Sequence, residues 1–311
     1  MRSATFSRSA DAALLELLSR LGEAGYDFIS PTPATHRLVR RRRSAAPGDF
    51  LRDVFGWGRR FEARHAPAWL LHLLREAEAL DEGPEGCAST IRISKLDGRL
   101  HLHSASSHEK ESVFLGPDSY RYVRFLRQSL GSSSFQRALE IGVGAGAGAL
   151  MLAAREPGAR VTATDVNPEA LRLACLNARH SGLELDLQAG SFPAGDGRFD
   201  LIVANPPYIA GRQGRLYCDG GDQFGAETAL EWTSSALQRL EPEGRLVLYT
   251  GAPVVAGADL IRRRLEILAV RHGGTLNYDE IDPDVFGGLL KSDAYRSVER
   301  IAAVGAVITM P

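Results

Sequence analysis

A four-residue motif in the second half of the chain has the residue types needed to transfer a methyl group to a planar nitrogen. In Asn205-Pro206-Pro207-Tyr208, the Asn205 side-chain oxygen and the Pro206 carbonyl can accept hydrogen bonds from the N–H groups of an amide or ring-amino nitrogen. Two such acceptors draw the nitrogen toward tetrahedral geometry, and the Tyr208 ring offers a face on which the planar group stacks. The motif therefore predicts N-methylation with Asn205, Pro206 and Tyr208 as catalytic residues. Pro207 and Tyr208 are predicted to bind the substrate, and a proline-rich strand end is the alternative interpretation.

A glycine-rich turn provides a matching cofactor site. An apolar run is followed by Gly142, Gly144, Gly146 and Gly148, which open a predicted helix, so their backbone N–H groups can approach an anionic ligand closely. Asp165 ends the next predicted strand, where a carboxylate can accept hydrogen bonds from both hydroxyls of a ribose. These features suit NAD and S-adenosylmethionine equally. The four-residue motif favours S-adenosylmethionine, with S-adenosylhomocysteine as the product.

The elements that must position these residues alternate between strands and helices from about residue 119 onward. Apolar strands are predicted over residues 137–142, 160–165, 183–188, 199–204, 244–250, 275–281 and 301–308. Helices are predicted over residues 148–155 and 167–180. Such alternation predicts an α/β fold with a doubly wound, Rossmann-like, mostly parallel seven-stranded sheet, whose ligand lies at the carboxyl ends of the strands. Asp165 and Asn205 both fall at those ends.

The N-terminal third of the chain has a different pattern. Leucines recur on one face of a predicted helix over residues 11–21, and a second helical stretch follows Pro67. Residues 90–103 alternate on either side of Asp97 and Gly98, a pattern typical of a hairpin with a primed turn. Helices followed by a two-stranded wing predict a small α+β domain that is winged-helix-like.

The chain is predicted to divide into two domains. Residues 1–112 would recognise the substrate or act as a lid, and residues 113–311 would form the catalytic domain with its cofactor. The run 40–43 makes the first domain locally basic, so RNA or another polyanion could bind there, and a solvated linker is the alternative. His101 and His103 share one strand face without a cysteine or acid at ligand spacing, so we expect a surface position and no metal.

Composition limits the class of protein. With 44% hydrophobic residues, 24% charged residues and a formal net charge of -1, the 311-residue chain is typical of globular proteins that have no overall attraction for nucleic acid. Three scattered cysteines exclude a disulfide framework. No apolar stretch approaches the roughly 18 residues of a membrane span, so we expect a cytoplasmic protein with no membrane contact.

Residues 137–250 resemble the class I S-adenosylmethionine-dependent methyltransferases. The Asn-Pro-Pro-Tyr motif is similar to that of the subgroup acting on planar nitrogens, which includes glutamine methyltransferases of proteins, adenine methyltransferases of DNA and guanine methyltransferases of ribosomal RNA. The resemblance implies a set of cofactor-binding residues, with Asp165 on the ribose and Val166 beside the adenine. The set comprises Phe114, Gly116, Glu140, Gly142, Gly144, Gly146, Asp165, Val166, Asn167, Ser191, Phe192 and Asn205.

Part of this implied site departs from the family pattern. Ser191 stands where many relatives carry an acid that contacts the adenine amino group, so we expect Phe192 to pack on the adenine ring instead. Residues 114–118 stand where relatives place a segment that covers the methionine end of the cofactor. Residues 286–288 connect the last two predicted strands and could reach the mouth of the site.

The sequence leaves the methyl acceptor unidentified. A loop rich in glycine and aspartate contains Tyr217 and Asp219, which we expect to bind the acceptor as part of a lid. The leading interpretation is a protein glutamine or an RNA base, and the second is a small metabolite or natural product. The N-terminal half does not match the helical domain of the glutamine methyltransferases that modify release factors. A cofactor-binding regulatory module or a nucleotide-dependent oxidoreductase is the alternative from another class.

Overall fold

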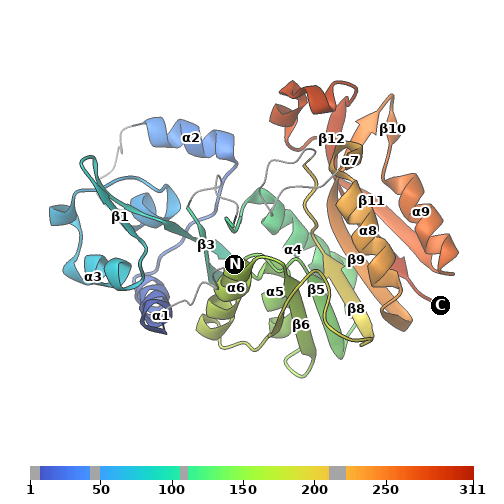
Figure 1. Cartoon of the computed structure of the whole chain (residues 1–311), viewed down its shortest axis with the longest axis horizontal. Coiled ribbons are helices and arrows are strands. Elements are labelled where there is room, and N and C mark those ends of the chain that lie inside the picture. The colour runs from blue at the N-terminus through green and yellow to red at the C-terminus, as the bar shows by residue number, and fades with distance from the viewer. Residues whose placement is uncertain (1–7, 43–49, 106–110, 210–221) are drawn as a thin grey trace.

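The centre of the molecule is a sheet built from the C-terminal two thirds of the chain (Figure 1). The computed structural model describes residues 8–42, 50–105, 111–209 and 222–311. In order across the sheet, the strands are β11 (Thr275–Asp282), β12 (Arg300–Thr309), β9 (Leu240–Val255), β8 (Phe199–Ala204), β5 (Arg137–Ile141), β6 (Arg160–Asp165) and β7 (Asp186–Ala189). The strands from β9 to β7 are parallel, and β12 is antiparallel to both of its neighbours. The predicted seven-stranded, mostly parallel sheet is confirmed, and the short strand β10 (Ala258–Asp259) joins it at β9.

Helices cover both faces of this sheet, as a doubly wound fold requires. They are α4 (Pro117–Leu130), α5 (Ala147–Arg155), α6 (Pro168–His180), α7 (Asp222–Gly225), α8 (Glu227–Leu237) and α9 (Arg262–Arg271). Along β8, Leu201 and Val203 belong to one hydrophobic cluster with buried residues of α4, α5 and α6. Ile202 and Ala204 belong to a second cluster with buried residues of α8 and α9. Because both faces are buried, β8 is a continuous apolar run from Leu201 to Ala204 and does not alternate there.

The N-terminal part of the chain consists of helices and two short hairpins. Its elements are α1 (Arg8–Glu23), α2 (Pro33–Arg41), α3 (Ala68–Glu76), β1 (Leu80–Gly83), β2 (Gly86–Ser89), β3 (Ile91–Leu96) and β4 (Arg99–Ser104), with short helical turns at Arg52–Gly56 and Ala63–His65. Strands β3 and β4 form the predicted hairpin, and Asp97 and Gly98 at its turn have φ of 54° and 79°, as a primed turn requires. The β1–β2 hairpin was not predicted, because β1 has a single apolar side chain. The winged-helix character and the boundary after residue 112 stay predictions.

One buried amide joins the N-terminal part to the sheet domain. Asn177 of α6 is fully buried, and its Oδ1 accepts a hydrogen bond from the Leu102 N–H of β4 at 2.8 Å. Its Nδ2 donates to the Leu102 carbonyl at 3.1 Å and to the Ala145 carbonyl at 3.0 Å. Ala145 lies in the glycine-rich turn, so a single side chain holds the hairpin and that turn together.

The prediction that His101 and His103 lie at the surface is wrong. The two side chains are only 1% and 2% exposed, because both faces of β4 are covered. His103 Nε2 shares a hydrogen bond with Ser94 Oγ at 2.9 Å, whereas neither ring nitrogen of His101 has a partner in the described part of the chain. Burial lowers the pKa of His101 to about 4, so its ring is neutral at physiological pH. The alternating sequence could not distinguish a strand with one covered face from a strand with two.

Candidate active site

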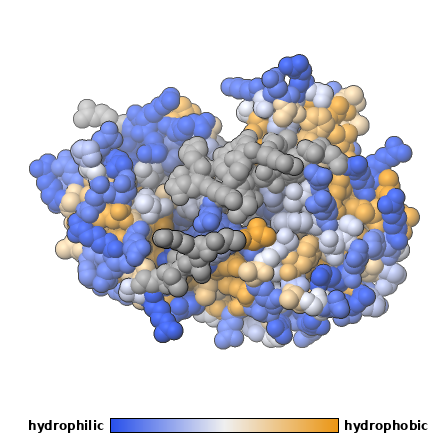
Figure 2. Space-filling view, viewed as in Figure 1, coloured by the Kyte–Doolittle hydropathy of each residue, from blue (hydrophilic) through white to orange (hydrophobic). Residues whose placement is uncertain are grey.

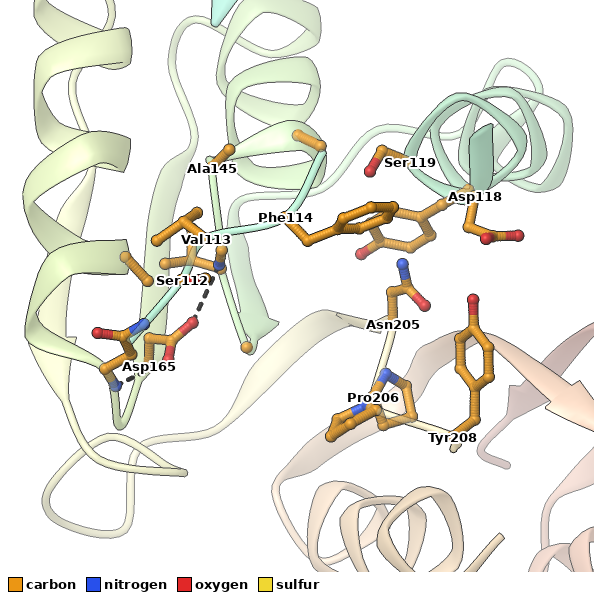
Figure 3. A pocket seen from close by; sticks show the side chains of 18 of the residues that line it. Ser112, Val113, Phe114, Asp118, Ser119, Ala145, Asp165, Asn205, Pro206 and Tyr208 are labelled. Atoms are coloured by element: carbon orange, nitrogen blue, oxygen red, sulfur yellow. Dashed lines mark hydrogen bonds between the residues drawn. The ribbon is translucent and has the colours of Figure 1, made fainter. Parts of the chain in front are cut away.

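A cavity of about 500 Å³ lies at the carboxyl ends of β5, β6 and β8 (Figure 3). From β5 the chain first builds β6 and β7 on one side and then β8 and β9 on the other, and ligands of doubly wound folds bind at this reversal. The predicted site residues in the cavity wall are Phe114, Glu140, Gly142, Gly144, Asp165, Val166, Asn167, Ser191, Asn205, Pro206, Pro207 and Tyr208. The fold therefore brings the glycine-rich turn and the Asn-Pro-Pro-Tyr motif to one site. Tyr217 and Asp219 lie outside the described residues.

The turn after β5 requires glycine for its backbone conformation. Gly142, Gly144 and Gly146 have φ of 73°, 51° and 85°, a region that other residues rarely adopt. The N–H groups of Gly142 and Val143 both donate to the Thr164 carbonyl at 2.9 Å, which fastens the turn to β6. The turn is thus held in place by the protein itself.

The Asp165 carboxylate is oriented by two backbone groups. Its Oδ2 accepts from the Gly144 N–H at 3.0 Å, and its Oδ1 accepts from the Asn167 N–H at 2.9 Å. Burial raises the pKa of Asp165, and these two N–H groups oppose that rise by stabilising the charged form. Asn167 itself caps α6 by accepting from the Glu169 N–H at 3.0 Å. Each carboxylate oxygen of Asp165 keeps a lone pair for a further donor such as a hydroxyl.

Glu140 forms a buried polar wall of the cavity and is 2% exposed. Its Oε1 accepts a hydrogen bond from the Tyr122 hydroxyl at 3.0 Å, and its Oε2 accepts from the Ala149 N–H at 2.5 Å. Burial raises the pKa of Glu140 to about 8, against the opposing effect of these donors. A Cβ atom at position 148 would collide with the Glu140 carboxyl group, so glycine at the start of α5 leaves the space that this carboxyl group occupies.

Asn205 contributes to the cavity a buried side-chain oxygen that lacks an internal partner. The residue follows β8 directly, and its side chain lies between Phe114 and Tyr208 (Figure 3). Its Oδ1 is buried and has no hydrogen-bond partner in the part of the chain that the structure describes. An unsatisfied buried carbonyl costs about 1–3 kcal/mol, so this oxygen is prepared for a donor that arrives with a ligand.

Tyr208 is held on three sides. Its ring lies against Gly251 of β9, where an added Cβ would come within 2.7 Å of the ring, and 5.5 Å between centroids from the Phe286 ring. Its hydroxyl faces the Asp118 carboxylate, which accepts a hydrogen bond from the Tyr249 hydroxyl at 2.8 Å. Burial, followed by the Asp118 charge, raises the pKa of Tyr208 well above its ordinary value, so the phenol stays protonated. A phenol held in its protonated form does not act as a general base.

The predicted residues Gly116, Gly146 and Phe192 do not line the cavity. Gly116 lies behind the Phe114 ring, which a side chain at position 116 would displace. Gly146 faces Leu150 of α5, and Phe192 packs with the second hydrophobic cluster under the guanidinium of Arg239. Because Phe192 lies outside the cavity wall, its packing on an adenine ring stays a prediction.

Two elements flank the mouth of the cavity. Helix α2 contributes Pro33 and Arg37, and the segment at the helical turn η3 (Gly287–Lys291) contributes Phe286 and Leu289. The predicted approach of residues 286–288 to the mouth is confirmed by Phe286. In Figure 1, α2 and this segment, coloured red, lie on opposite sides of the molecule's upper edge. Figure 2 shows mainly hydrophilic side chains over α2.

Sequence reasoning missed the residues that support Tyr208 from a distance. Asp118 lies within the predicted segment 114–118, and its position in the first turn of a helix after Pro117 gave no sign of a contact with Tyr249. Gly251 continues an apolar strand and carries no local signal either. Among the described residues, no group of three metal-binding side chains comes together, and none of the described helices is both long and apolar enough to cross a membrane.

Comparison with known proteins identifies the domain that contains this cavity. Residues 121–254 match the family model of the methyltransferase small domain. Over 188 residues the chain is 55% identical to the release factor glutamine methyltransferase of Deinococcus radiodurans, a match that covers 60% of this chain and 66% of that protein. Residues 121–254 are therefore similar in sequence to a methyltransferase domain. The predicted family resemblance is thereby confirmed.

Other relatives match over shorter stretches. The chain is 35% identical over 155 residues to the release factor glutamine methyltransferase of Chlorobaculum tepidum, covering 45% of this chain and 47% of that protein. The match thus spans just under two thirds of the first relative and about half of the second. Among solved structures, Trm5b from Pyrococcus abyssi aligns with a TM-score of 0.51 at 15% identity, over 87% of this chain and 79% of its own. At that identity the similarity shows the fold alone.

One half of the cavity suits S-adenosylmethionine, the methyl donor of this class. Asp165 offers carboxylate lone pairs for the ribose hydroxyls, and a Cβ at Gly144 would meet nothing within 4 Å, so the space beside the turn is open. Val166 lines the wall with a side chain that is 53% exposed, an apolar surface of the kind that an adenine ring covers. The residues present in the cavity therefore fit the cofactor.

Proposed function

We propose that this protein is an N-methyltransferase whose acceptor is the side-chain amide of a protein glutamine. The observation that carries the proposal is the buried Asn205 Oδ1 without a partner, in the wall of the same cavity as Pro206 and Tyr208. A primary amide presents two N–H groups, and the Asn205 oxygen and the Pro206 carbonyl are the two acceptors that match them. The relatives named release factor glutamine methyltransferases support a protein amide as the acceptor and a release factor as its source.

The cofactor, when bound, supplies an electrophilic methyl group on a sulfonium. The acceptor nitrogen is a poor nucleophile because its lone pair is delocalised into the amide carbonyl. Hydrogen bonds to Asn205 and Pro206 hold both N–H groups out of that plane, and the Tyr208 ring fixes the amide by stacking. The nitrogen becomes acidic as the methyl arrives, so its surplus proton leaves to water along the hydrogen bond to Asn205 Oδ1. The products are the N-methyl amide, a proton and S-adenosylhomocysteine.

The cofactor-binding residues are proposed in the same way. Asp165 would accept the ribose hydroxyls, Val166 would flank the adenine, and the turn containing Gly144 would lie along the methionine and ribose side. We further propose that residues 1–112 recognise the acceptor, because α2 forms part of the cavity wall. A cytoplasmic location stays a prediction.

Methylation of a purified release factor from the same cell tests the function. The full chain is incubated with S-adenosylmethionine and the factor, and mass spectrometry counts methyl groups and assigns them by fragmentation. We expect one methyl on a glutamine, none on a factor in which that glutamine is replaced by alanine, and none with Asn205→Ala enzyme. Binding of S-adenosylhomocysteine without methylation of any glutamine would show that the acceptor is wrong and the cofactor right.

A further inference from the structure

Helix α2 presents an exposed face at the mouth of the cavity. Ala34, Arg37, Leu38 and Arg41 follow the spacing of one helix face, and all four are exposed, Leu38 by 57%. No residue of α2 is fully buried. Arg37 also lines the cavity, so this face, here called the α2 face, continues directly into the site.

The opposite side of α2 is fixed to the body of the protein. The Arg59 guanidinium donates to the Val39 and Arg42 carbonyls, each at 3.0 Å, and forms an ion pair with Asp53 at 3.0 Å. The His36 ring lies 5.7 Å from the Trp57 ring. The α2 face is therefore carried on an anchored helix with a defined orientation.

The charges of the α2 face are not neutralised within the described part of the chain. Neither Arg37 nor Arg41 forms an ion pair or a side-chain hydrogen bond there, unlike Arg59. Residues 28–48 include five arginines and no aspartate or glutamate. This local surplus of positive charge contrasts with the net charge of -1 of the whole chain, and a negatively charged partner would be attracted to it.

We propose that the α2 face binds an acidic segment of the acceptor protein, beside the residue that enters the cavity. This inference rests on the proposed function. A polypeptide suits the face better than RNA because Leu38 lies exposed between the two arginines, and a segment that mixes acids with apolar residues complements both. Trp57, the ring that packs against His36 of α2, is also packed against Phe28 at 5.0 Å, which leaves it less free for base stacking.

The length of the face sets where the acids should lie. From Ala34 to Arg41 the helix advances about 10 Å, a distance that an extended peptide covers in about three residues. Because Arg37 borders the cavity, the acidic residues are expected within about six positions of the methylated residue. The α2 face would thus select acceptors by the charge of the flanking sequence.

A double charge reversal tests this proposal. In the full chain, Arg37→Glu/Arg41→Glu should raise KM for the acceptor protein by about tenfold at low salt, with kcat changed less than about twofold. Affinity for S-adenosylhomocysteine and the unfolding midpoint should be unchanged. The difference from wild type should shrink at about 0.5 M salt, where exposed charges are screened. The matched control is Arg263→Glu/Arg271→Glu on α9, which lies far from α2 in Figure 1. An unchanged KM in the α2 variant, or an equal rise in the control, would overturn the proposal.

A binding measurement separates this proposal from the proposed function. If the wild-type enzyme methylates no release factor, the proposed function is wrong. The α2 face can still be tested by binding alone. The probes are a dye-labelled peptide of alternating Glu and Leu, one of alternating Lys and Leu, and oligouridine. Fluorescence anisotropy is expected to show binding of the Glu-Leu peptide alone, weakened about tenfold by Arg37→Glu/Arg41→Glu. Tighter binding of oligouridine, or binding of the Glu-Leu peptide that survives the reversal, would refute the acidic-peptide partner.

Discussion

The two halves of the cavity differ in how their polar groups are satisfied. In the half formed by β5 and β6, the carboxylates of Glu140 and Asp165 each accept two hydrogen bonds from within the chain. In the half formed after β8, Asn205 Oδ1 is buried without a partner. The carboxyl groups of the first half thus have hydrogen-bond partners before a ligand binds. The Asn205 oxygen of the second half gains a partner only when a bound molecule donates a hydrogen bond to it. Under the proposed function, the first half would bind the cofactor with a preformed shape, and catalysis in the second half would use the unpaired oxygen of Asn205.

The largest expected effect comes from removing the unpaired oxygen. Asn205→Ala should lower the rate of methyl transfer by about 100- to 1,000-fold, because the acceptor amide loses one of two groups that hold its N–H bonds. Affinity for S-adenosylhomocysteine, measured by calorimetry, should stay within about twofold of wild type. Asn277→Ala, at an exposed position of β11, is the control. If the Asn205 variant transferred methyl groups at the wild-type rate, the unpaired oxygen would have no role in catalysis, and the difference between the two halves would have no functional meaning.

The buried carboxyl of the first half should make stability depend on pH. The pKa of Glu140 is about 8 in the folded protein against 4.5 ordinarily, so between these values the folded state binds more protons than the unfolded state. The free energy of unfolding should therefore fall as pH rises from about 5 to 8. Relative to Glu140→Gln, which cannot ionise, the fall should be on the order of 3 kcal/mol, measured by urea unfolding. Equal pH profiles for the two proteins would show that the burial of this group carries no electrostatic cost.

Asp165→Ala should separate cofactor binding from chemistry. Losing hydrogen bonds to a charged acceptor should weaken S-adenosylhomocysteine binding by about 10- to 50-fold, with a smaller effect on the rate at saturating cofactor. Asp200 provides a matched control, because its carboxylate also accepts two backbone N–H groups, from Gln136 and Arg137 at 2.7 and 3.0 Å, outside the cavity wall. Asp200→Ala should lower stability and leave affinity unchanged. Full affinity in the Asp165 variant would remove its ribose role.

A smaller effect is expected from crowding the Tyr208 ring. In Gly251→Ala the new methyl would lie 2.7 Å from the ring, so the ring must shift, and the transfer rate should fall by about tenfold. Cofactor affinity should not change, because β9 lies beside the second half alone. Gly22→Ala is the control, since its Cβ would meet nothing within 4 Å. An unaltered rate would mean that the stacking position of Tyr208 tolerates movement.

The sequence predicted the elements and the ligand-binding ends of the strands because these depend on local patterns. Glycines with positive φ, the Asp97-Gly98 turn and the apolar runs are visible in the residues themselves. The hydrogen bond between Tyr249 and Asp118 joins positions 131 residues apart, and no spacing rule connects them. The burial of His101 and the position of α2 in the cavity wall likewise depend on packing between distant segments. Gly116 and Phe192 were assigned by family position, and neither lies in the cavity wall.

The three hydrogen bonds of the Asn177 side chain couple local opening of the β3–β4 hairpin to local opening of the glycine-rich turn. The side chain holds both peptide groups of Leu102 and the carbonyl of Ala145, so local opening on either side breaks bonds needed by the other. A ligand that stabilises the turn must then slow amide hydrogen exchange in the β3–β4 hairpin, and any partner that tightens the hairpin must strengthen cofactor binding by the same free energy.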